Sequence, residues 1–241
     1  MHLLIDNSNT LTKFALDLGG ELSEWRGVIP TLDLSRTSVQ NTLHGRTFEK
    51  VTLCSVVPDA SNLMRSTLDQ PIHHISHHSK MPITIDYPNP SKIGADRLAN
   101  ATAAILDCQG PAIVIDFGTA VTFDVLSKAG SYLGGVIAPG TASLRDYLHQ
   151  KTALLPAIQL EEPNSAIGRS TEEAMQVGAV IGYRGLIREI LNEVRRELGG
   201  EPKIFATGGD AELIGKGMND IDIIDQDLTM KGIQVIGTLN H

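Results

Sequence analysis

The chain has 241 residues, a formal charge of −8 and a sequence pI near 5.4. This length is ample for a hydrophobic core and suits one large domain or two smaller lobes, which excludes a peptide or a coiled coil. The acidic balance lacks the concentrated positive charge that attracts nucleic acid or acidic lipid. We therefore expect a small-molecule partner, with no nucleic-acid and no membrane partner.

The first residues predict that the protein stays in the cytoplasm. Asp6 places a carboxylate where a signal peptide needs apolar sequence, and no apolar run reaches the ~18 residues of a membrane span. The two cysteines, Cys54 and Cys108, lie far apart without a second thiol nearby. This spacing predicts reduced thiols rather than a zinc site or a disulfide.

Short apolar runs rich in β-branched residues alternate with longer helical patterns, which favours an α/β fold. The apolar spacing of the longest helical pattern predicts one buried face, with Thr171 as the helix N-cap. In chain order, strands are expected over 3–5, 51–57, 113–115, 203–206 and 221–224, and helices over 94–106, 171–198 and 210–216.

An internal repeat indicates two duplicated lobes. The segment LLIDNSNT at 3–10 is matched by IVIDFGTA at 113–120: an apolar strand ends in Asp, and a tight polar turn leads to a second apolar run. The two aspartates, Asp6 and Asp116, are too far apart for a solenoid repeat. We expect lobes spanning 1–110 and 111–241, with one hairpin of each lining an active-site cleft between the lobes.

Polar turns of this kind suit phosphate binding. Their backbone N–H groups and hydroxyls can surround phosphate oxygens, and a carboxylate at a strand end can hold a divalent cation through water. One such turn is most often an ordinary β-turn. Two of them, together with the turn at Gly208–Gly209 after a third strand, favour a nucleotide site.

These hairpins resemble those of the actin-like ATPase and sugar-kinase superfamily, which has ribonuclease H-like lobes. Further motifs narrow the match, and the resemblance extends from Asp6 to Gly209. The motifs that resemble the type III pantothenate kinases, in order and in spacing, are YPNPSKIGADR at 87–97, DFGTA at 116–120, GGVIAPG at 134–140, TALLP at 152–156 and IGRST at 167–171.

The resemblance implies that ATP phosphorylates the primary hydroxyl of pantothenate, the first step of coenzyme A biosynthesis. That hydroxyl must lose a proton as it attacks the γ-phosphate, and Asp96 is the implied proton acceptor. Without the surrounding motif, Asp96 is better explained as a helix-start carboxylate that pairs with Arg97 or caps the helix amides. The resemblance also implies that Tyr87, Gly94, Ala95, Asp96 and Arg97 line the substrate site, where the Arg97 fork suits a carboxylate or an amide oxygen.

The implied cofactors are ATP, Mg²⁺ and a monovalent cation, K⁺ or NH₄⁺. Asp116 is implied to lie beside the monovalent cation, and Asp6 is expected to hold Mg²⁺ through water. The implied nucleotide-binding residues are Asp6, Asn7, Ser8, Asn9, Thr10, Leu11, Thr12 and Lys13 of the first hairpin, with Gly118, Thr119 and Thr122 of the second.

The resemblance also implies a homodimer in which Thr171 reaches the substrate of the partner subunit. A threonine at a helix start is otherwise only an N-cap, and the two roles are compatible.

Two departures from the family pattern keep alternatives open. Ser8 stands where the family usually has Gly, and Val121 stands where it often has Thr. A serine forced to positive φ would be strained by about 1 kcal/mol, whereas at negative φ its hydroxyl adds a donor. The alternatives are a kinase-like binding or regulatory protein that has lost turnover, and a related small-molecule kinase of the same superfamily.

Four histidines, at 73, 74, 77 and 78, have spacings that zinc sites use. Prolines bracket the segment, and it contains no carboxylate or thiol. A functional metal site is therefore disfavoured for this segment.

Overall fold

The computed structural model describes residues 1–108 and 110–241, apart from the side chain of Leu144. The chain forms two compact units. None of the helices in these described ranges has the length and apolar character needed to span a membrane. Unit 1 comprises Met1–Gln109, Gly130–Leu133 and Asp227–His241, and unit 2 comprises Gly110–Ala129 and Gly134–Gln226.

Unit 1 contains a five-stranded mixed sheet in the order β3-β2-β1-β4-β5. The central strand β1 is antiparallel to β2 and parallel to β4, and all its residues are buried because helices cover both faces of the sheet. The strands are β1 (His2–Asn7), β2 (Leu11–Asp17), β3 (Leu22–Pro30), β4 (Lys50–Ser55) and β5 (Ile72–His74).

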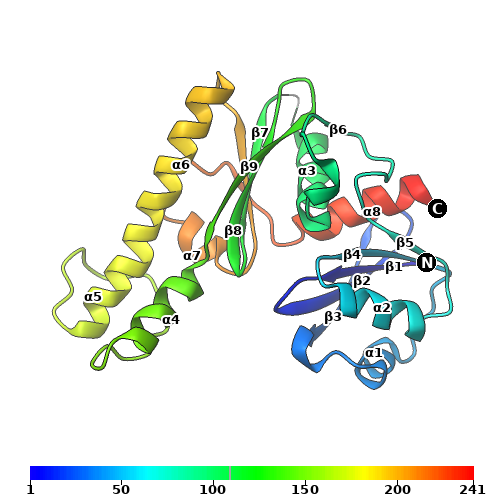
Figure 1. The fold of residues 1–241 in the computed structure, drawn as a ribbon, viewed down its shortest axis with the longest axis horizontal. Coiled ribbons are helices and arrows are strands. Elements are labelled where there is room, and N and C mark those ends of the chain that lie inside the picture. The colour runs from blue at the N-terminus through cyan, green and yellow to red at the C-terminus, as the bar shows by residue number, and fades with distance from the viewer. Residues whose placement is uncertain (109) are drawn as a thin grey trace. The chain divides into compact units, whose positions relative to one another are not determined.

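One face of this sheet carries α1 and α2, whose Val39, Leu43 and Met64 join the apolar core. The other face carries α8, which in turn packs against α3 (Figure 1). Gly232 of α8 lies against the backbone of Ala99, where a side chain would not fit. The helices of unit 1 are α1 (Arg36–Leu43), α2 (Pro58–Thr67), α3 (Ala95–Asp107) and α8 (Leu228–Asn240), with 3-10 turns η1 (Thr31–Asp33) and η2 (Pro90–Lys92).

Unit 2 repeats the strand order of unit 1. Its strands run β9-β8-β7-β10-β11, with β7 antiparallel to β8 and parallel to β10. The short strand β6 (Thr84–Ile85) pairs with Ser131 and Tyr132, the part of β9 that belongs to unit 1. The other strands are β7 (Ala112–Phe117), β8 (Ala120–Leu126), β9 (Ser131–Pro139), β10 (Lys203–Thr207) and β11 (Ile223–Ile224).

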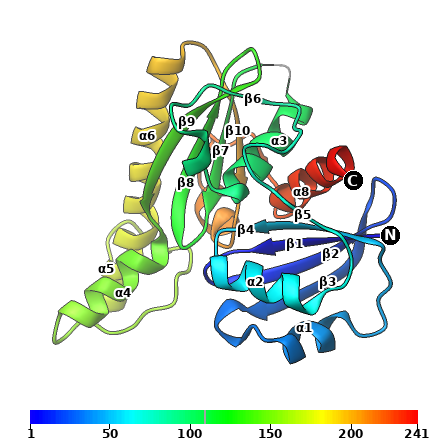
Figure 2. The same ribbon diagram turned by 45° about the vertical axis from the view of Figure 1, so that its right-hand side comes forward.

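The core of unit 2 lies between its sheet and the helices α6 and α7 (Figure 2). A π-helical turn, η3 (Gly178–Gly182), joins α5 to α6, so the single long helix predicted over 171–198 is interrupted there. Ile187 and Leu191 of α6 are fully buried, but Ile181 is 40% exposed. The helices are α4 (Thr141–Lys151), α5 (Thr171–Val177), α6 (Tyr183–Leu198) and α7 (Ala211–Gly215).

The repeated strand order confirms the two duplicated lobes of an α/β fold. Two segments differ from the predicted lobe bounds, because residues 130–133 and 227–241 belong to unit 1 rather than to the second lobe. Gln234 of α8 explains the placement of 227–241 in part, since its Nε2 donates to Asp17 Oδ1 of β2 over 2.8 Å.

Candidate functional site

The first hairpin presents a short polar turn between β1 and β2. Asp6 is 8% exposed and lies opposite Lys13 in the strand register. Ser8 closes the turn, because its amide and its hydroxyl each donate to the Leu11 carbonyl over 3.0 Å. The turn therefore exposes Asn9 and leaves the carboxylate of Asp6 buried at the strand end.

Asp96 stands in the first turn of α3, two residues after the N-cap Gly94. The Arg97 amide donates to Asp96 Oδ1 over 2.8 Å. Burial raises the pKa of the Asp96 carboxyl above 3.8, and the Arg97 amide and charge oppose that rise. A side chain at position 94 would collide with this carboxylate, which explains the glycine. Asp96 is thus a half-buried carboxylate with a raised affinity for a proton.

An aromatic pair lies beside this helix start. The rings of Tyr87 and Tyr132 meet edge to face with centroids 6.3 Å apart, and Tyr87 is 37% exposed. Arg97 Cζ lies 5.9 Å from the Tyr132 ring centroid, within cation–π range. Tyr87 and Arg97, predicted as substrate residues, are therefore held around the buried ring of Tyr132.

The second hairpin, between β7 and β8 in unit 2, is packed against the Gly-Gly turn. Gly208 has φ +96°, and a Cβ there would lie 2.6 Å from the Phe117 carbonyl oxygen and 2.7 Å from Asp116 Oδ1. Asp116 lies opposite Thr122 in the register, and Thr119 is exposed at the turn. The sequence predicts that the Gly-Gly turn and the second hairpin belong together, and the structure brings them into contact.

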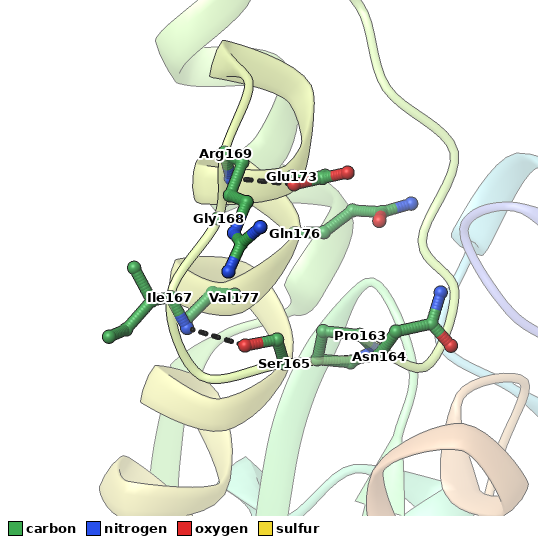
Figure 3. Close-up of a pocket in the computed structure, with 9 residues that line it drawn as sticks. All are labelled: Pro163, Asn164, Ser165, Ile167, Gly168, Arg169, Glu173, Gln176 and Val177. Atoms are coloured by element: carbon green, nitrogen blue, oxygen red, sulfur yellow. Dashed lines mark hydrogen bonds between the residues drawn. The ribbon is translucent and has the colours of Figure 1, made fainter.

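The segment before α5 surrounds a cavity of about 230 Å³ (Figure 3). Thr171 is exposed and is the first helical residue, while Ser170 is the N-cap and accepts from the Glu173 amide at 3.1 Å. Glu173 Oε2 in turn accepts from the Arg169 amide at 2.6 Å. The prediction of Thr171 as N-cap is therefore wrong by one residue, because the Ser170 hydroxyl satisfies the free helix amide. The cavity is lined by Pro163, Asn164, Ser165, Ile167, Gly168, Arg169, Glu173, Gln176 and Val177.

Comparison with known proteins identifies the family. The family model for type III pantothenate kinase matches residues 2–193. The type III pantothenate kinase of Akkermansia muciniphila is 49% identical over 239 residues, covering 99% of both chains. That of Methylacidiphilum infernorum is 42% identical, covering 98% of this chain and 88% of its own. The chain belongs to the type III pantothenate kinase family.

A solved kinase has a similar fold. The inorganic polyphosphate/ATP-glucomannokinase of Arthrobacter sp. strain KM superimposes with a TM-score of 0.53 at 16% identity, and all of both chains is covered. At that identity the likeness concerns the fold alone. It agrees with the sugar-kinase type of fold predicted from the two hairpins.

The two departures from the family pattern have structural explanations. Among the described residues only glycines have positive φ, so Ser8 adopts a backbone that any residue can take. Its hydroxyl closes the turn instead of straining it. Val121 is fully buried in the apolar core of unit 2, so this position offers no side chain to a ligand. Neither departure gives structural support to a loss of turnover in this pantothenate kinase.

Several residues near these motifs were not predicted from the sequence of this pantothenate kinase. Tyr132 is the second residue of β9 and looks like an ordinary strand residue. The Thr141 hydroxyl donates to the Asp210 carboxylate and joins α4 to the turn that follows Gly209. The position of Asp210 directly after the Gly-Gly turn was a usable signal. Thr31, whose hydroxyl donates to the Ser8 carbonyl, offered no such signal, because it follows β3 and lies outside every motif.

The four histidines at 73, 74, 77 and 78 contact neighbouring side chains. Arg65 Nε donates to His74 Nε2 over 2.8 Å, and His73 Nε2 lies 2.8 Å from Ser79 Oγ. His77 and His78 stack with ring centroids 3.9 Å apart.

Proposed function

We propose that this protein transfers the γ-phosphoryl group of ATP to the primary hydroxyl of pantothenate, the first step of coenzyme A biosynthesis. Family membership supports the reaction. The mechanism rests on the half-buried carboxylate of Asp96 at the start of α3, whose pKa is raised by burial. Because the reaction consumes cellular ATP, we assign it to the cytoplasm.

Asp96 acts as the general base in this proposal. The attacking oxygen of pantothenate forms a bond to the γ-phosphorus, the bond from phosphorus to the ADP oxygen breaks, and the hydroxyl proton passes to Asp96. A carboxylate with a raised pKa is a better proton acceptor than an ordinary one. The Arg97 amide fixes its Oδ1, which orients the second oxygen as the acceptor.

Arg97 and Tyr87 bind the substrate in this proposal. Pantothenate carries a carboxylate and an amide, both of which the guanidinium fork can bind. The edge-to-face contact of Tyr87 with Tyr132 supports one side of that site with rigid apolar surface.

Each hairpin, within its own unit, offers side-chain oxygens and backbone N–H groups that suit phosphates and cations. Among the described residues no group of three His, Cys, Asp or Glu side chains could hold a metal ion. Mg²⁺ is commonly held by one or two carboxylates together with phosphates and waters, so Asp6 fits as a ligand through water. Asp116 fits a monovalent cation, and Lys13 and Thr119 suit phosphate oxygens. When bound, the cations offset the negative charge of the phosphates.

The direct test measures ADP release with and without pantothenate, for the wild-type protein and for Asp96→Asn. We expect pantothenate-dependent turnover in the wild type, and a 10²- to 10⁴-fold fall in kcat in the variant, because the amide cannot accept the proton. The control is Asp107→Asn at the exposed end of the same helix, which should change kcat less than twofold. A fall below threefold in Asp96→Asn, with normal melting, would make Asp96 structural.

The raised pKa of Asp96 also predicts the acid side of the pH profile. The base must be ionised, so kcat/KM, which reports groups of the free enzyme, falls as the pH drops through the pKa of Asp96. Since burial raises that pKa, the fall occurs at higher pH than an exposed aspartate near 3.8 would give. A profile that stays flat down to that ordinary value would contradict the role of Asp96.

We also propose that the protein is a homodimer whose partner contributes Thr171. Figures 1 and 2 show α4 and α5 side by side. Exposed apolar side chains lie on α4, on η3 and on the segments that adjoin α4 and α5. Burial of such a surface against a second copy would remove it from water. The exposed side chains are Tyr147 at 62%, Leu148 at 40%, Leu154 at 91%, Ile167 at 77% and Ile181 at 40%.

Mixing two inactive variants tests the contribution of Thr171. If Thr171 acts on the partner's site, dimers that combine Asp96→Asn with Thr171→Phe collect both defects in one site and leave the other intact. About a quarter of wild-type activity is then the ceiling after random exchange. No recovery, in a mixture shown to contain mixed dimers, would restrict Thr171 to its own subunit.

The monovalent cation is tested by exchanging the salt. Turnover with Mg²⁺ should rise on replacing Na⁺ by K⁺ or NH₄⁺ at constant ionic strength, because Asp116 is proposed to hold that cation. Equal rates in the three salts would overturn the assignment.

A further inference from the structure

A polar network lies beneath the first hairpin and ends on its turn. Asn7 and Thr12 are buried on neighbouring strands, and Asn7 Nδ2 donates to Thr12 Oγ1 over 2.8 Å. Ser55 Oγ of β4 donates to Asn7 Oδ1 over 2.6 Å. Thr31 Oγ1 lies 3.1 Å from Thr12 Oγ1 and donates to the Ser8 carbonyl over 2.8 Å. The network therefore links the sheet interior to the exposed turn.

The number of hydroxyl hydrogens sets the direction of these bonds. A threonine hydroxyl has one hydrogen to donate. Thr31 uses its hydrogen for the Ser8 carbonyl, so the bond between the two threonines must be donated by Thr12. The oxygen of Thr12 in turn accepts from Asn7. All the bonds from Asn7 onward are therefore oriented toward the Ser8 carbonyl, and each strengthens the next.

The position of that carbonyl fixes the amide of the next residue. In a planar trans peptide the C=O and N–H groups point in opposite directions, and the described chain contains no cis peptide. Because the Ser8 carbonyl points to Thr31, the Asn9 N–H points away from Thr31. Thr31 also holds the other side of the turn, since its amide donates to the Thr10 carbonyl over 2.9 Å.

We propose that Thr31 is a positioning residue for the nucleotide phosphates. Its hydroxyl holds the Ser8–Asn9 peptide so that the Asn9 amide is oriented to donate to a phosphate oxygen, as backbone amides do in anion-binding turns. The inference rests on the proposed ATP site of the first hairpin. It also gives a new role to Asn7, whose side chain is 1% exposed and supports the network from inside the sheet.

The test compares Thr31→Val, which keeps the shape and loses the hydroxyl, with Thr31→Ser, which keeps the hydroxyl. Loss of one or two modest hydrogen bonds should raise the KM for ATP, and the Kd for ATP without pantothenate, about three- to tenfold. The KM for pantothenate should stay within twofold, and Thr31→Ser should stay within twofold of the wild type throughout. A purely structural role would not separate the two substrates in this way.

The matched control is Thr67→Val, because the buried hydroxyl of the half-buried Thr67 in α2 has no hydrogen-bond partner in the described structure. This variant should leave every constant unchanged. Ser55→Ala, at the far end of the network, should raise the KM for ATP in the same direction by a smaller factor. If Thr31→Val fails to fold, the KM for ATP of Ser55→Ala tests the proposal in its place.

An unchanged KM for ATP in Thr31→Val, or in Ser55→Ala if only that variant folds, would overturn the proposal. It would also be overturned if Thr31→Ser proved as weak as Thr31→Val. The Kd for ATP separates this inference from the proposed reaction. If the wild type bound ATP and did not phosphorylate pantothenate, a weaker Kd in Thr31→Val would still support the role of Thr31.

Discussion

Side-chain amides and hydroxyls support the turn between β1 and β2, whereas the turn between β7 and β8 rests against the backbone of a glycine turn. In unit 1 the Ser8 carbonyl is held by Thr31. In unit 2 the Phe117 carbonyl lies where the Cβ of residue 208 would be. A hydrogen bond can be lost at modest expense in free energy, but two backbones in contact leave no room for an added carbon. The duplicated hairpins should therefore respond differently to mutation.

The largest effect is expected for Gly208→Ala. The added carbon requires a strained positive φ and overlaps the Phe117 carbonyl, so we expect a loss of about 3 kcal/mol in the free energy of unfolding. Urea unfolding measures it. Gly209→Ala is the control, because a Cβ there has no neighbour within 4 Å in the described structure, and it should cost far less. Equal losses in the two variants would remove the proposed difference between the hairpins.

A second difference between the units is how their stability responds to low pH, and in unit 1 it depends on His2. His2 is 2% exposed, and its Nε2 lies 2.7 Å from Thr52 Oγ1. Its pKa is lowered from 6.5 to about 4, chiefly by burial and also by the charges of His241 and Lys50, while the charge of Asp17 opposes the shift. The folded protein therefore keeps His2 neutral, while the unfolded chain takes up a proton below pH 6.5. Stability falls as the pH drops from there toward 4.

Between pH 7 and pH 5 we expect this histidine to account for a loss of about 2 kcal/mol in the free energy of unfolding. Urea unfolding at both pH values, for the wild type and for His2→Gln, isolates the loss. In unit 2, burial raises the pKa of Tyr183, so this side chain stays neutral over the same range. Tyr183→Phe should consequently keep the wild-type pH dependence. An unchanged slope in His2→Gln would contradict the assignment.

The smallest effect is expected at Ser8. Ser8→Ala removes the hydrogen bond from the hydroxyl to the Leu11 carbonyl. Ser8→Gly removes it too and also adds backbone freedom to the unfolded chain. Each variant should lose about 1 kcal/mol or less in the free energy of unfolding, and Ser8→Gly should be the less stable of the two. Thermal unfolding of both variants measures the order. Gain of stability in Ser8→Gly would mean that the serine backbone is strained after all.

The sequence alone was sufficient for the elements that local pattern controls. The internal repeat around Asp6 and Asp116 predicted two lobes, because each hairpin needs the same succession of apolar strand, polar turn and apolar strand. The motifs around Asp96 predicted the family and thereby the reaction. The role of each predicted site residue stays a prediction until the variants are measured.

Only the tertiary structure revealed contacts between residues that are distant in the chain. In unit 1, α8 packs against α3 and β1, and the local sequence at 228–240 does not predict which elements it contacts. Tyr132 meets Tyr87 because β6 pairs with the start of β9. Thr31 reaches Ser8 because β3 runs antiparallel to β2. The end of β3 therefore lies beside the turn that precedes β2. Local patterns depend on the residues next in sequence, whereas such contacts depend on how the strands pair.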